Sequence, residues 1–267
     1  MLINKHRSAL LVALALTVLP LAAQAQRKSP LADAPAIRKR FELRSTRLEF
    51  GAGMGSTINQ DFYHTVLVQV KLGFHITDWL SLSGFGGFAV ANMATGYNER
   101  LVGALPDAQV PLDRAPTKAL GAAALQQVSS VFGGQLEITP FTGKYSLFGK
   151  LFASYDFYGF AGPGFINVKP TDAGMLQPCV DGTTTQTVCN VSGMKLGATF
   201  GVGMHTFFHQ AVALNVELRD IYAQLNPSGR DVNGDTFANN ADLGWTHTWM
   251  LGANVVLYLP TTASISQ

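Results

Sequence analysis

The stretch Val66-Leu67-Val68-Gln69-Val70-Lys71-Leu72-Gly73-Phe74-His75-Ile76 carries an apolar residue at every even position, with Gln, Lys, Gly and His at most of the odd ones. A period of two is the signature of a β-strand whose two faces meet different surroundings. The same alternation returns at 194–205 and 212–219. In a membrane β-barrel, such strands point apolar residues toward lipid and polar or small residues into a lumen.

The composition fits a membrane setting. The chain has 267 residues, of which 47% are hydrophobic and only 13% charged, whereas a soluble domain usually carries about 25% charged residues. An aromatic content of 10% excludes a disordered chain. A net charge of +2 leaves no basic surface for nucleic acid.

Residues 1–25 have the features of a secretory signal peptide. Lys5 and Arg7 form the positive start, an apolar stretch follows from Ala9 to Ala23, and Ala23-Gln24-Ala25 is a cleavage motif. An uncleaved membrane anchor is the alternative, although the apolar stretch is short for a span of about 20 residues. We therefore expect export and cleavage.

No uninterrupted apolar run of about 18 residues, as a transmembrane helix needs, follows this segment. Only helices and closed barrels satisfy every backbone group in lipid, so an exported apolar chain without such a run indicates a barrel. The expected location is the outer membrane of a Gram-negative bacterium. The competing interpretation is a soluble sandwich or lipocalin-type barrel, whose exterior would be rich in Lys and Glu. The polar faces here carry many Gly, Ser and Thr and few charges.

Alternation and turn-forming residues place eight strands, near 45–55, 62–76, 79–91, 128–139, 144–168, 193–208, 211–223 and 243–259. Tight turns are expected at 77–78, 140–143 and 209–210, and longer polar connections at 56–61, 92–127, 169–192 and 224–242. Short and long connections alternate, as in outer-membrane barrels with short periplasmic turns and longer external loops. We therefore predict an all-β fold, an eight-stranded antiparallel transmembrane β-barrel of the outer membrane.

The predicted barrel occupies 45–259, after a basic periplasmic leader at 26–44 and before a polar C-terminal tail at 260–267. Without Lys5 and Arg7 the chain keeps 17 basic residues, and seven of these lie between Arg27 and Arg47. They are expected either to contact anionic lipid headgroups or periplasmic polymer, or to form a plain flexible leader.

Short motifs support a family resemblance over residues 40–259. They are Arg40-Phe41-Glu42-Leu43, Asn59 to Phe62, Gly73-Phe74-His75, Pro140-Phe141-Thr142-Gly143-Lys144, Tyr155-Asp156-Phe157-Tyr158, Gly162-Pro163-Gly164 and Glu217-Leu218-Arg219-Asp220. The chain resembles in these motifs an outer-membrane β-barrel domain family described mainly from myxobacterial-type genomes. The resemblance implies a small outer-membrane barrel and brings no assigned activity. The end of the chain departs from the common barrel pattern, because Tyr258 is internal.

The expected register points balanced charges into the lumen. The positive residues are Arg47, Lys71, Lys150, Lys195 and Arg219, and the negative ones are Glu49, Glu137, Asp156 and Glu217. An eight-stranded barrel is just wide enough for side chains to fill. A selective pore favours a ring of one sign, and unpaired buried charge is costly. We therefore expect a side-chain-filled, structural lumen, with a narrow gated pore for small solutes as the main alternative.

An enzymatic role is not expected. The sequence has no nucleophile elbow, H-E-x-x-H motif or phosphate loop. A lipid-modifying outer-membrane enzyme is the third functional alternative, with His247 and Thr248 near the outer rim. Neighbours on one strand face opposite sides, however, so these two residues cannot share a site. His75 and His205 are expected to be hydrogen-bonded lumen residues. We predict no catalytic residue and no cofactor.

One loop partly matches a calcium-binding template. Asp231, Asn233, Asp235 and Asp242 fall at positions 1, 3, 5 and 12, but position 6 is Thr236 instead of Gly. Asp, Asn and Gly also form ordinary turns in exposed loops. A solvated loop is preferred, so no metal site is predicted.

The combined expectation is a small outer-membrane barrel with a structural or surface-interaction role through its external loops. Loop 92–127, the largest, contains three prolines and an alanine-rich stretch, and is expected to bind a partner or form a short surface helix. The expected partners are outer-membrane lipids, the barrel assembly machinery, and an extracellular ligand or protein held by the loops. Nucleic acid is not among them.

We predict a disulfide between Cys179 and Cys189, the two cysteines of the chain. An exported protein meets an oxidising compartment, and the nine intervening residues, Val180 to Val188, include the turn pair Asp181-Gly182. The bond should stabilise the loop by about 2–3 kcal/mol. A zinc site is not expected, because two Cys without nearby His supply too few ligands. A redox pair is not expected, because the spacing is not C-x-x-C.

Thiol labelling of the unreduced, denatured protein from envelopes checks this bond. We expect no free thiol, and two free thiols per chain would refute it. A dimer that disappears on reduction would place the bond between chains.

Overall fold

The computed structural model describes residues 44–108, 116–147, 151–171, 191–234 and 238–261. The predicted signal peptide, almost all of the basic leader, most of the C-terminal tail, and the pair Cys179 and Cys189 lie outside the described residues. No described helix is both long and apolar enough to cross a membrane.

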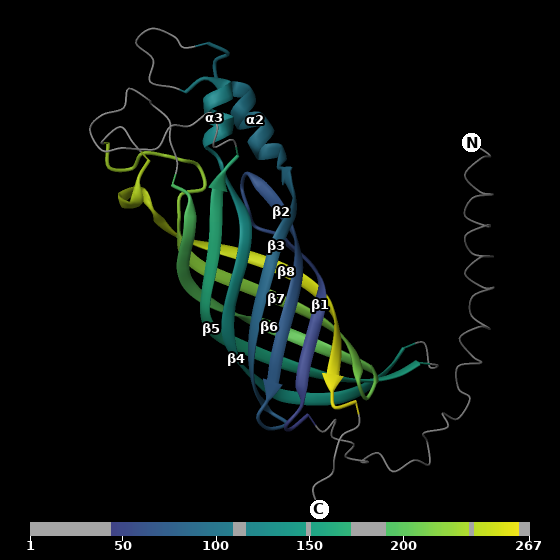
Figure 1. Ribbon diagram of the computed structural model, residues 1–267. Helices are drawn as coiled ribbons and strands as arrows, with labels where there is room; N and C mark the ends of the chain where they lie inside the picture. The colour runs from purple at the N-terminus through teal and green to yellow at the C-terminus, as the bar shows by residue number, and fades with distance from the viewer. Residues whose placement is uncertain (1–43, 109–115, 148–150, 172–190, 235–237, 262–267) are drawn as a thin grey trace, which may run out of the picture. The chain divides into compact units, whose positions relative to one another are not determined.

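Eight antiparallel strands close into a barrel in sequence order, as predicted (Figure 1). Closure is made by β1 pairing with β8, in a register that runs from Leu48 opposite Leu259 to Thr57 opposite Met250. The strands are β1 (Leu48–Thr57), β2 (Tyr63–His75), β3 (Leu80–Ala94), β4 (Gln126–Leu147), β5 (Leu151–Pro170), β6 (Gly193–His209), β7 (Val212–Leu225) and β8 (Gly244–Leu259).

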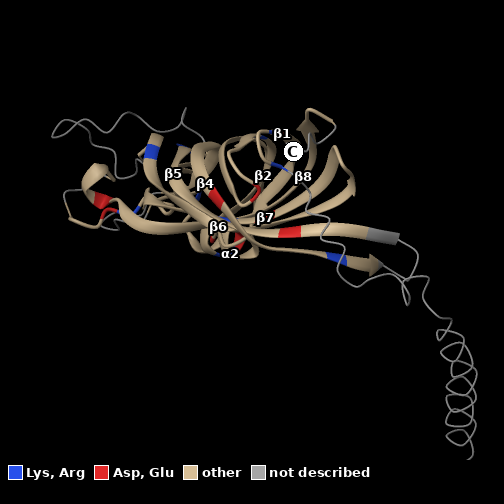
Figure 2. Ribbon diagram, turned by 90° about the horizontal axis from the view of Figure 1, so that it is seen from below, with Lys and Arg blue, Asp and Glu red and all other residues tan. Residues whose placement is uncertain are grey.

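The period-two pattern sets the two faces of the barrel wall, and β2 shows this most clearly. Lys71 and His75 are each 2% exposed, whereas Leu72 and Phe74, which lie between them, are 61% and 44% exposed. The outer face of the strands is therefore mainly apolar, and most of each strand in Figure 2 is free of charged residues. A soluble barrel has the opposite arrangement, with apolar residues inside and charged residues outside.

One predicted turn is wrong. Residues 140–143 are not a turn, because β4 continues through them and pairs with β5 as far as Leu147 opposite Leu151. The register shifts between Ile138 and Phe141, so Pro140 lies in a bulge, where no ladder hydrogen bond is lost. The pairing of β3 with β4 ends at Ile138. Beyond it, β4 and β5 project as a hairpin past Leu80, where β3 begins (Figure 1).

The longest connection contains two short helices, in agreement with the surface-helix alternative. They are α2 (Gly96–Ala104) and α3 (Lys118–Ala124), and their N-caps Thr95 and Thr117 each accept a backbone N–H with the side chain. Both helices lie at the end of the barrel where β2 begins and β3 ends, which we call the helical end (Figure 1). The opposite end, where β1 begins and β8 ends, is called the terminal end.

The register yields a direct test. In a membrane, an arginine on the lipid-facing side near mid-membrane should cost roughly 2–4 kcal/mol, because the charge must enter hydrocarbon. We expect Val70→Arg and Val202→Arg, at outward positions, to lower the folded fraction strongly. The adjacent Gln69, which borders a lumenal cavity, should accept Gln69→Arg at lower cost.

The folded fraction is measured by gel migration of unboiled samples after refolding into lipid vesicles. Equal losses for Val70→Arg and Gln69→Arg would contradict the assigned inside and outside faces.

Candidate functional site

The lumen is filled by two layers of side chains with different chemistry. Toward the terminal end lies an ionic layer, which comprises Arg44, Glu49, Lys71, His75, Glu137, Asp156, His205, Glu217 and Arg219. Toward the helical end lies an apolar layer of Leu67, Val128, Val131, Ile166, Val168, Ile221, Ala223, Leu225 and Met250. The ionic layer is the main concentration of chemistry-bearing groups in the described barrel.

Lys71 on β2 lies at the centre of the ionic layer. Its Nζ is 2.7 Å from Oε1 of Glu137, 3.3 Å from Oε1 of Glu49 and 3.7 Å from Oε2 of Glu217. These carboxylates come from β4, β1 and β7, so one ammonium group joins four strands across the lumen. Tyr158 on β5 is 3.3 Å from the same nitrogen and donates its hydroxyl to Glu217.

The two lumenal histidines are hydrogen-bonded, as predicted. Nε2 of His75 lies 2.9 Å from Oε2 of Glu49. Nδ1 of His205 lies 2.8 Å from Oδ1 of Asp156, and its Nε2 lies 3.5 Å from Glu49. A carboxylate on each imidazole fixes the orientation of the ring. Both rings are buried within the lumen and have no open face for a substrate.

Arg44 joins the ionic layer from outside the strands, although the sequence places it in the leader. Its guanidinium lies 2.6 Å from Oδ2 of Asp156 and is 2% exposed. Burial is the largest single influence and by itself lowers the pKa of Arg44. The nearby acidic groups, Asp156 foremost, together more than offset it, so the pKa lies above its ordinary value. Arg44, the last residue of the predicted leader, therefore contributes to closing the lumen at the terminal end. No periodicity marks this residue, since it precedes the first strand.

Arg219 lies where the ionic layer meets the apolar layer. It forms an ion pair with Glu217 and donates to Oγ1 of Thr199 at 3.1 Å. Its guanidinium carbon also lies 3.5 Å from the ring centroid of Phe85, and 4.6 Å from that of Phe160. Cation–π contacts of this kind stabilise a charge where water is excluded.

Glu137 is surrounded by four donor groups. It accepts hydrogen bonds from Ser81 at 2.9 Å, from Ser83 at 2.5 Å and from Gln135 at 2.7 Å, besides its ion pair with Lys71. Four carboxylates in the layer therefore face three arginine or lysine cations and two histidines. Such a network can hold charge in a low dielectric because each member has partners.

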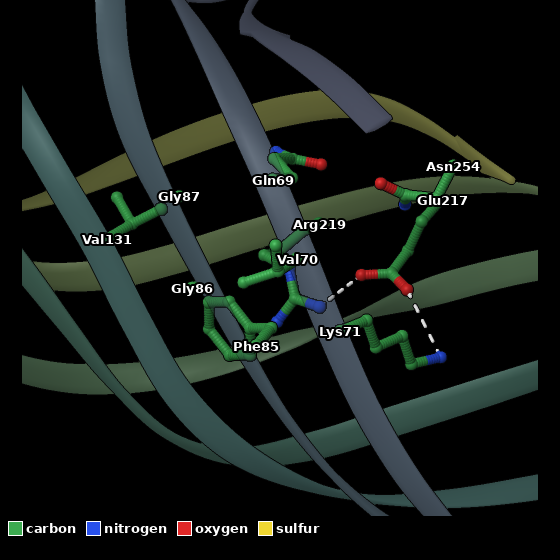
Figure 3. A pocket seen from close by; sticks show the side chains of 10 residues that line it. All are labelled: Gln69, Val70, Lys71, Phe85, Gly86, Gly87, Val131, Glu217, Arg219 and Asn254. Atoms are coloured by element: carbon green, nitrogen blue, oxygen red, sulfur yellow. Dashed lines mark hydrogen bonds and ion pairs between the residues drawn. The ribbon is translucent and has the colours of Figure 1, made fainter. Parts of the chain in front are cut away.

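Little space is left between the layers. A cavity of about 20 Å³, lined by Gln69, Lys71, Phe85, Glu217, Arg219 and Asn254 among others, has room for about one water molecule (Figure 3). Figure 3 shows Arg219 and Lys71 both pointing toward Glu217. The ionic layer and the apolar layer together fill the lumen, and we call them the plug.

Most of the predicted lumenal charges are where the sequence places them. Arg47, Lys71, Arg219 and all four predicted acidic residues are buried. Lys195 is only half-buried and donates to Asn240 at 3.0 Å, so it belongs to the helical end and not to the ionic layer. Lys150 lies outside the described residues. The sequence-based prediction did not include the apolar layer. A signal exists, because Leu67 and Ile221 are apolar residues at positions where the alternation of their strands otherwise places polar ones.

The loop that partly matches a calcium template is organised by hydrogen bonds to the backbone. Oδ1 of Asp242 accepts the amide N–H groups of Val232 and Asn233 at 2.8 and 3.1 Å, and Oδ2 accepts that of Asn239 at 2.8 Å. Asp242, at position 12 of the template, therefore acts as a turn-forming side chain. Asp235 and Thr236 lie outside the described residues. Across the described residues, no group of three or more His, Cys, Asp or Glu could hold a metal ion.

His247 and Thr248 face opposite sides of β8, as predicted. Thr248 is fully buried in the lumen and accepts from Gln60 at 3.4 Å. The side chain of His247 is 52% exposed and lies on the outer face, where its Nδ1 is 2.5 Å from Oδ2 of Asp220. No local pattern in the sequence marks Asp220 as the partner of His247.

Comparison with known proteins finds similarity at the level of solved structures. The first is the N-terminal β-barrel domain of OprF from Pseudomonas aeruginosa, at 11% identity and a TM-score of 0.41, covering 80% of this chain and 98% of that one. Ail, the attachment invasion locus protein of Yersinia pestis, matches at 11% identity and a TM-score of 0.39, with coverage of 80% and 99%. The outer membrane protein OprG of Pseudomonas aeruginosa matches at 11% identity and a TM-score of 0.41, with coverage of 81% and 97%.

No family model and no curated protein matches the chain. The resemblance to the myxobacterial-type barrel family therefore stays a prediction.

The ionic layer predicts a large effect of one substitution. Lys71→Met removes the cation that three buried carboxylates share, and leaving buried charge uncompensated should lower the free energy of unfolding by about 3–5 kcal/mol. Lys195→Met is the matched control, because that lysine is half-buried and loses one hydrogen bond.

Urea unfolding in lipid vesicles measures the difference. Adding Glu137→Gln to Lys71→Met should recover part of the loss, since one of the unpaired charges is then removed. Equal stability of the two lysine variants would show that the ion pairs do not hold the lumen together.

Proposed function

We propose that this protein is an outer-membrane β-barrel with a closed lumen that presents its helical end at the cell surface for interaction. The observation that carries this proposal is the combination of an apolar outer wall with a lumen filled by two layers of side chains. The wall fits lipid, and the filled lumen fits a structural or interacting protein better than a conduit.

The apolar outer face has the height of a bilayer. On β8 the outward positions from Leu251 to Leu259 are all apolar, and 9–11 tilted residues are enough to cross the hydrocarbon core. Tryptophans flank this band. Trp245 is 57% exposed at the helical end, and Trp79 is 55% exposed at the terminal end. Aromatic residues at both interfaces are typical of membrane barrels.

The two lumenal layers oppose conduction in different ways. The ionic layer ties β1, β2, β4 and β7 together through Lys71. The apolar layer offers no polar lining to water and ions. A gated pore would have to open both layers, and no single described loop or helix lies where it could move both. We therefore place the gated pore second.

The surface role rests on what the helical end exposes. On α2, Tyr97 is 55% exposed and Leu101 is 38% exposed, and Met93 at the end of β3 is 52% exposed. Apolar side chains beyond the membrane are suited to contact with another macromolecule. Helix α2 itself is firmly attached, because Asn98 is buried and donates to the backbone oxygen of Phe62.

The first test is orientation in intact cells. In a Cys179→Ser, Cys189→Ser background, Tyr97→Cys should react with a membrane-impermeant maleimide, because it lies at the helical end. Ser45→Cys, exposed at the terminal end, is the matched control and should react only after the outer membrane is permeabilised. The reverse labelling would overturn the proposed surface role.

The second test is conductance in planar bilayers, with protein that migrates differently in boiled and unboiled gel samples. We expect no steady large openings from the wild type, because the lumen is filled. Steady large openings would refute the closed lumen in favour of the pore. Identical migration of boiled and unboiled samples, with protease sensitivity throughout, would contradict the membrane barrel itself.

A further inference from the structure

A carboxylate and an imidazole lie together on the outer face of the barrel, away from the lumen. Asp220 on β7 is fully buried, and its Oδ2 lies 2.5 Å from Nδ1 of His247 on β8, whose side chain is 52% exposed. Asp220 lies on the outward phase of β7, since Arg219 and Ile221 on either side point into the lumen. The plug does not involve this pair.

Aromatic rings hold the imidazole in place. The ring of Tyr222 stacks on His247 with centroids 4.5 Å apart, and Trp245 stacks on Tyr222 at 4.9 Å. Phe200 and Trp249 are the cross-strand neighbours of Asp220 on its two sides. The carboxylate is fully buried, and its Oδ1 has no hydrogen-bond partner among the described residues. A buried carboxylate and a half-exposed imidazole thus share the outer wall with aromatic residues.

The pair lies at the edge of the apolar band. The outward residues toward the terminal end are apolar, beginning with Leu218 on β7 and Leu251 on β8. Toward the helical end they are Tyr222 and Gln224 on β7. Tyrosine and tryptophan gather at the depth of lipid headgroups. In the proposed membrane location, His247 therefore lies at headgroup depth.

A purely structural role accounts poorly for the pair. The backbone ladder between β7 and β8 is continuous here, with Asp220 opposite Trp249 and Ile221 opposite Thr248, so the strands need no extra link. Well-packed apolar residues usually replace a buried ion pair without loss of stability. Ionisable side chains in the lipid-exposed wall are rare, and they mark function more often than packing.

The orientation of the imidazole indicates what it can bind. Nδ1 is directed at Asp220, so Nε2 is the ring nitrogen left for an external group. In the imidazolium form Nε2 is a donor, and its natural acceptor at this depth is a phosphate oxygen. We propose that His247 binds the phosphate of an outer-leaflet lipid headgroup, with Asp220 as the positioning residue. This inference rests on the proposed membrane location.

The experiment uses the full mature chain in dodecyl maltoside micelles, at pH 6, with added phosphatidylglycerol. Native mass spectrometry counts the bound lipid. Losing a charge-assisted hydrogen bond should weaken binding about tenfold in His247→Gln. Asp220→Asn should weaken it by a similar factor, and His247→Lys, which keeps a cation, should restore most of it. The matched control is His64→Gln, at the helical end of β2, which should bind like the wild type.

Two further ligands separate the sources of the signal. Diacylglycerol with the same acyl chains should bind equally weakly to every variant, and inorganic phosphate should bind far more weakly than the lipid. The proposal is overturned if His247→Gln binds phosphatidylglycerol like the wild type, or if diacylglycerol shows the same tenfold difference. Inorganic phosphate binding as tightly as the lipid would also overturn it, by indicating a site for a soluble anion.

Folding is checked on each sample by the gel shift between boiled and unboiled protein. A wild type without this shift would count against the membrane barrel, whereas shifted samples with equal lipid binding count against the headgroup site alone. If His247→Gln or Asp220→Asn does not assemble, His247→Lys carries the test. Loss of lipid binding in assembled His247→Lys would refute the role of the cation.

Discussion

The pairing of β1 with β8 is the constraint on which the rest of the structure depends. It removes both sheet edges, so every strand finds hydrogen-bond partners on two sides, and the wall can turn an apolar face outward. Closure with eight strands also fixes the width of the lumen, which side chains can just fill. Once the barrel is closed, the remaining question is which side chains occupy the inside, and at which depth.

The answer changes along the barrel axis, and β7 shows where. Toward the terminal end, Glu217 and Arg219 point inward while Val216 and Leu218 point outward. Further along, Ile221, Ala223 and Leu225 point inward, and the outward residues become Asp220, Tyr222 and Gln224. Within a few residues, the inward side chains change from charged to apolar, and the outward ones change from apolar to polar or aromatic. This change is the one expected of a strand that passes from an apolar to an aqueous environment, because the apolar residues of a water-exposed barrel belong inside.

The sequence predicted the strands well because a period of two is a local signal that eight strands repeat. It failed where local signals have two meanings. Pro140 and Gly143 suggest a turn, but a bulge accommodates the proline, and the ring of Tyr155 lies against Gly143, which has no side chain in its way. It also failed where a contact joins distant parts of the chain. Nothing near Arg44 indicates that Asp156 is its partner, and nothing near Asp220 indicates His247.

The exchange of faces connects the plug with the outer wall. Toward the terminal end the outer face of the wall is apolar, so the charged side chains in the lumen can pair only with one another. The cluster of carboxylates around Lys71 is the result. Near the helical end the outer wall can carry charge, and there Asp220 and His247 stand outward while apolar residues fill the lumen behind them. An ionic network thus lies inside the barrel at one depth, and a carboxylate–imidazole pair lies outside at another. The effect of a substitution on stability therefore depends both on whether the residue faces the lumen or the outside and on its position along the barrel axis.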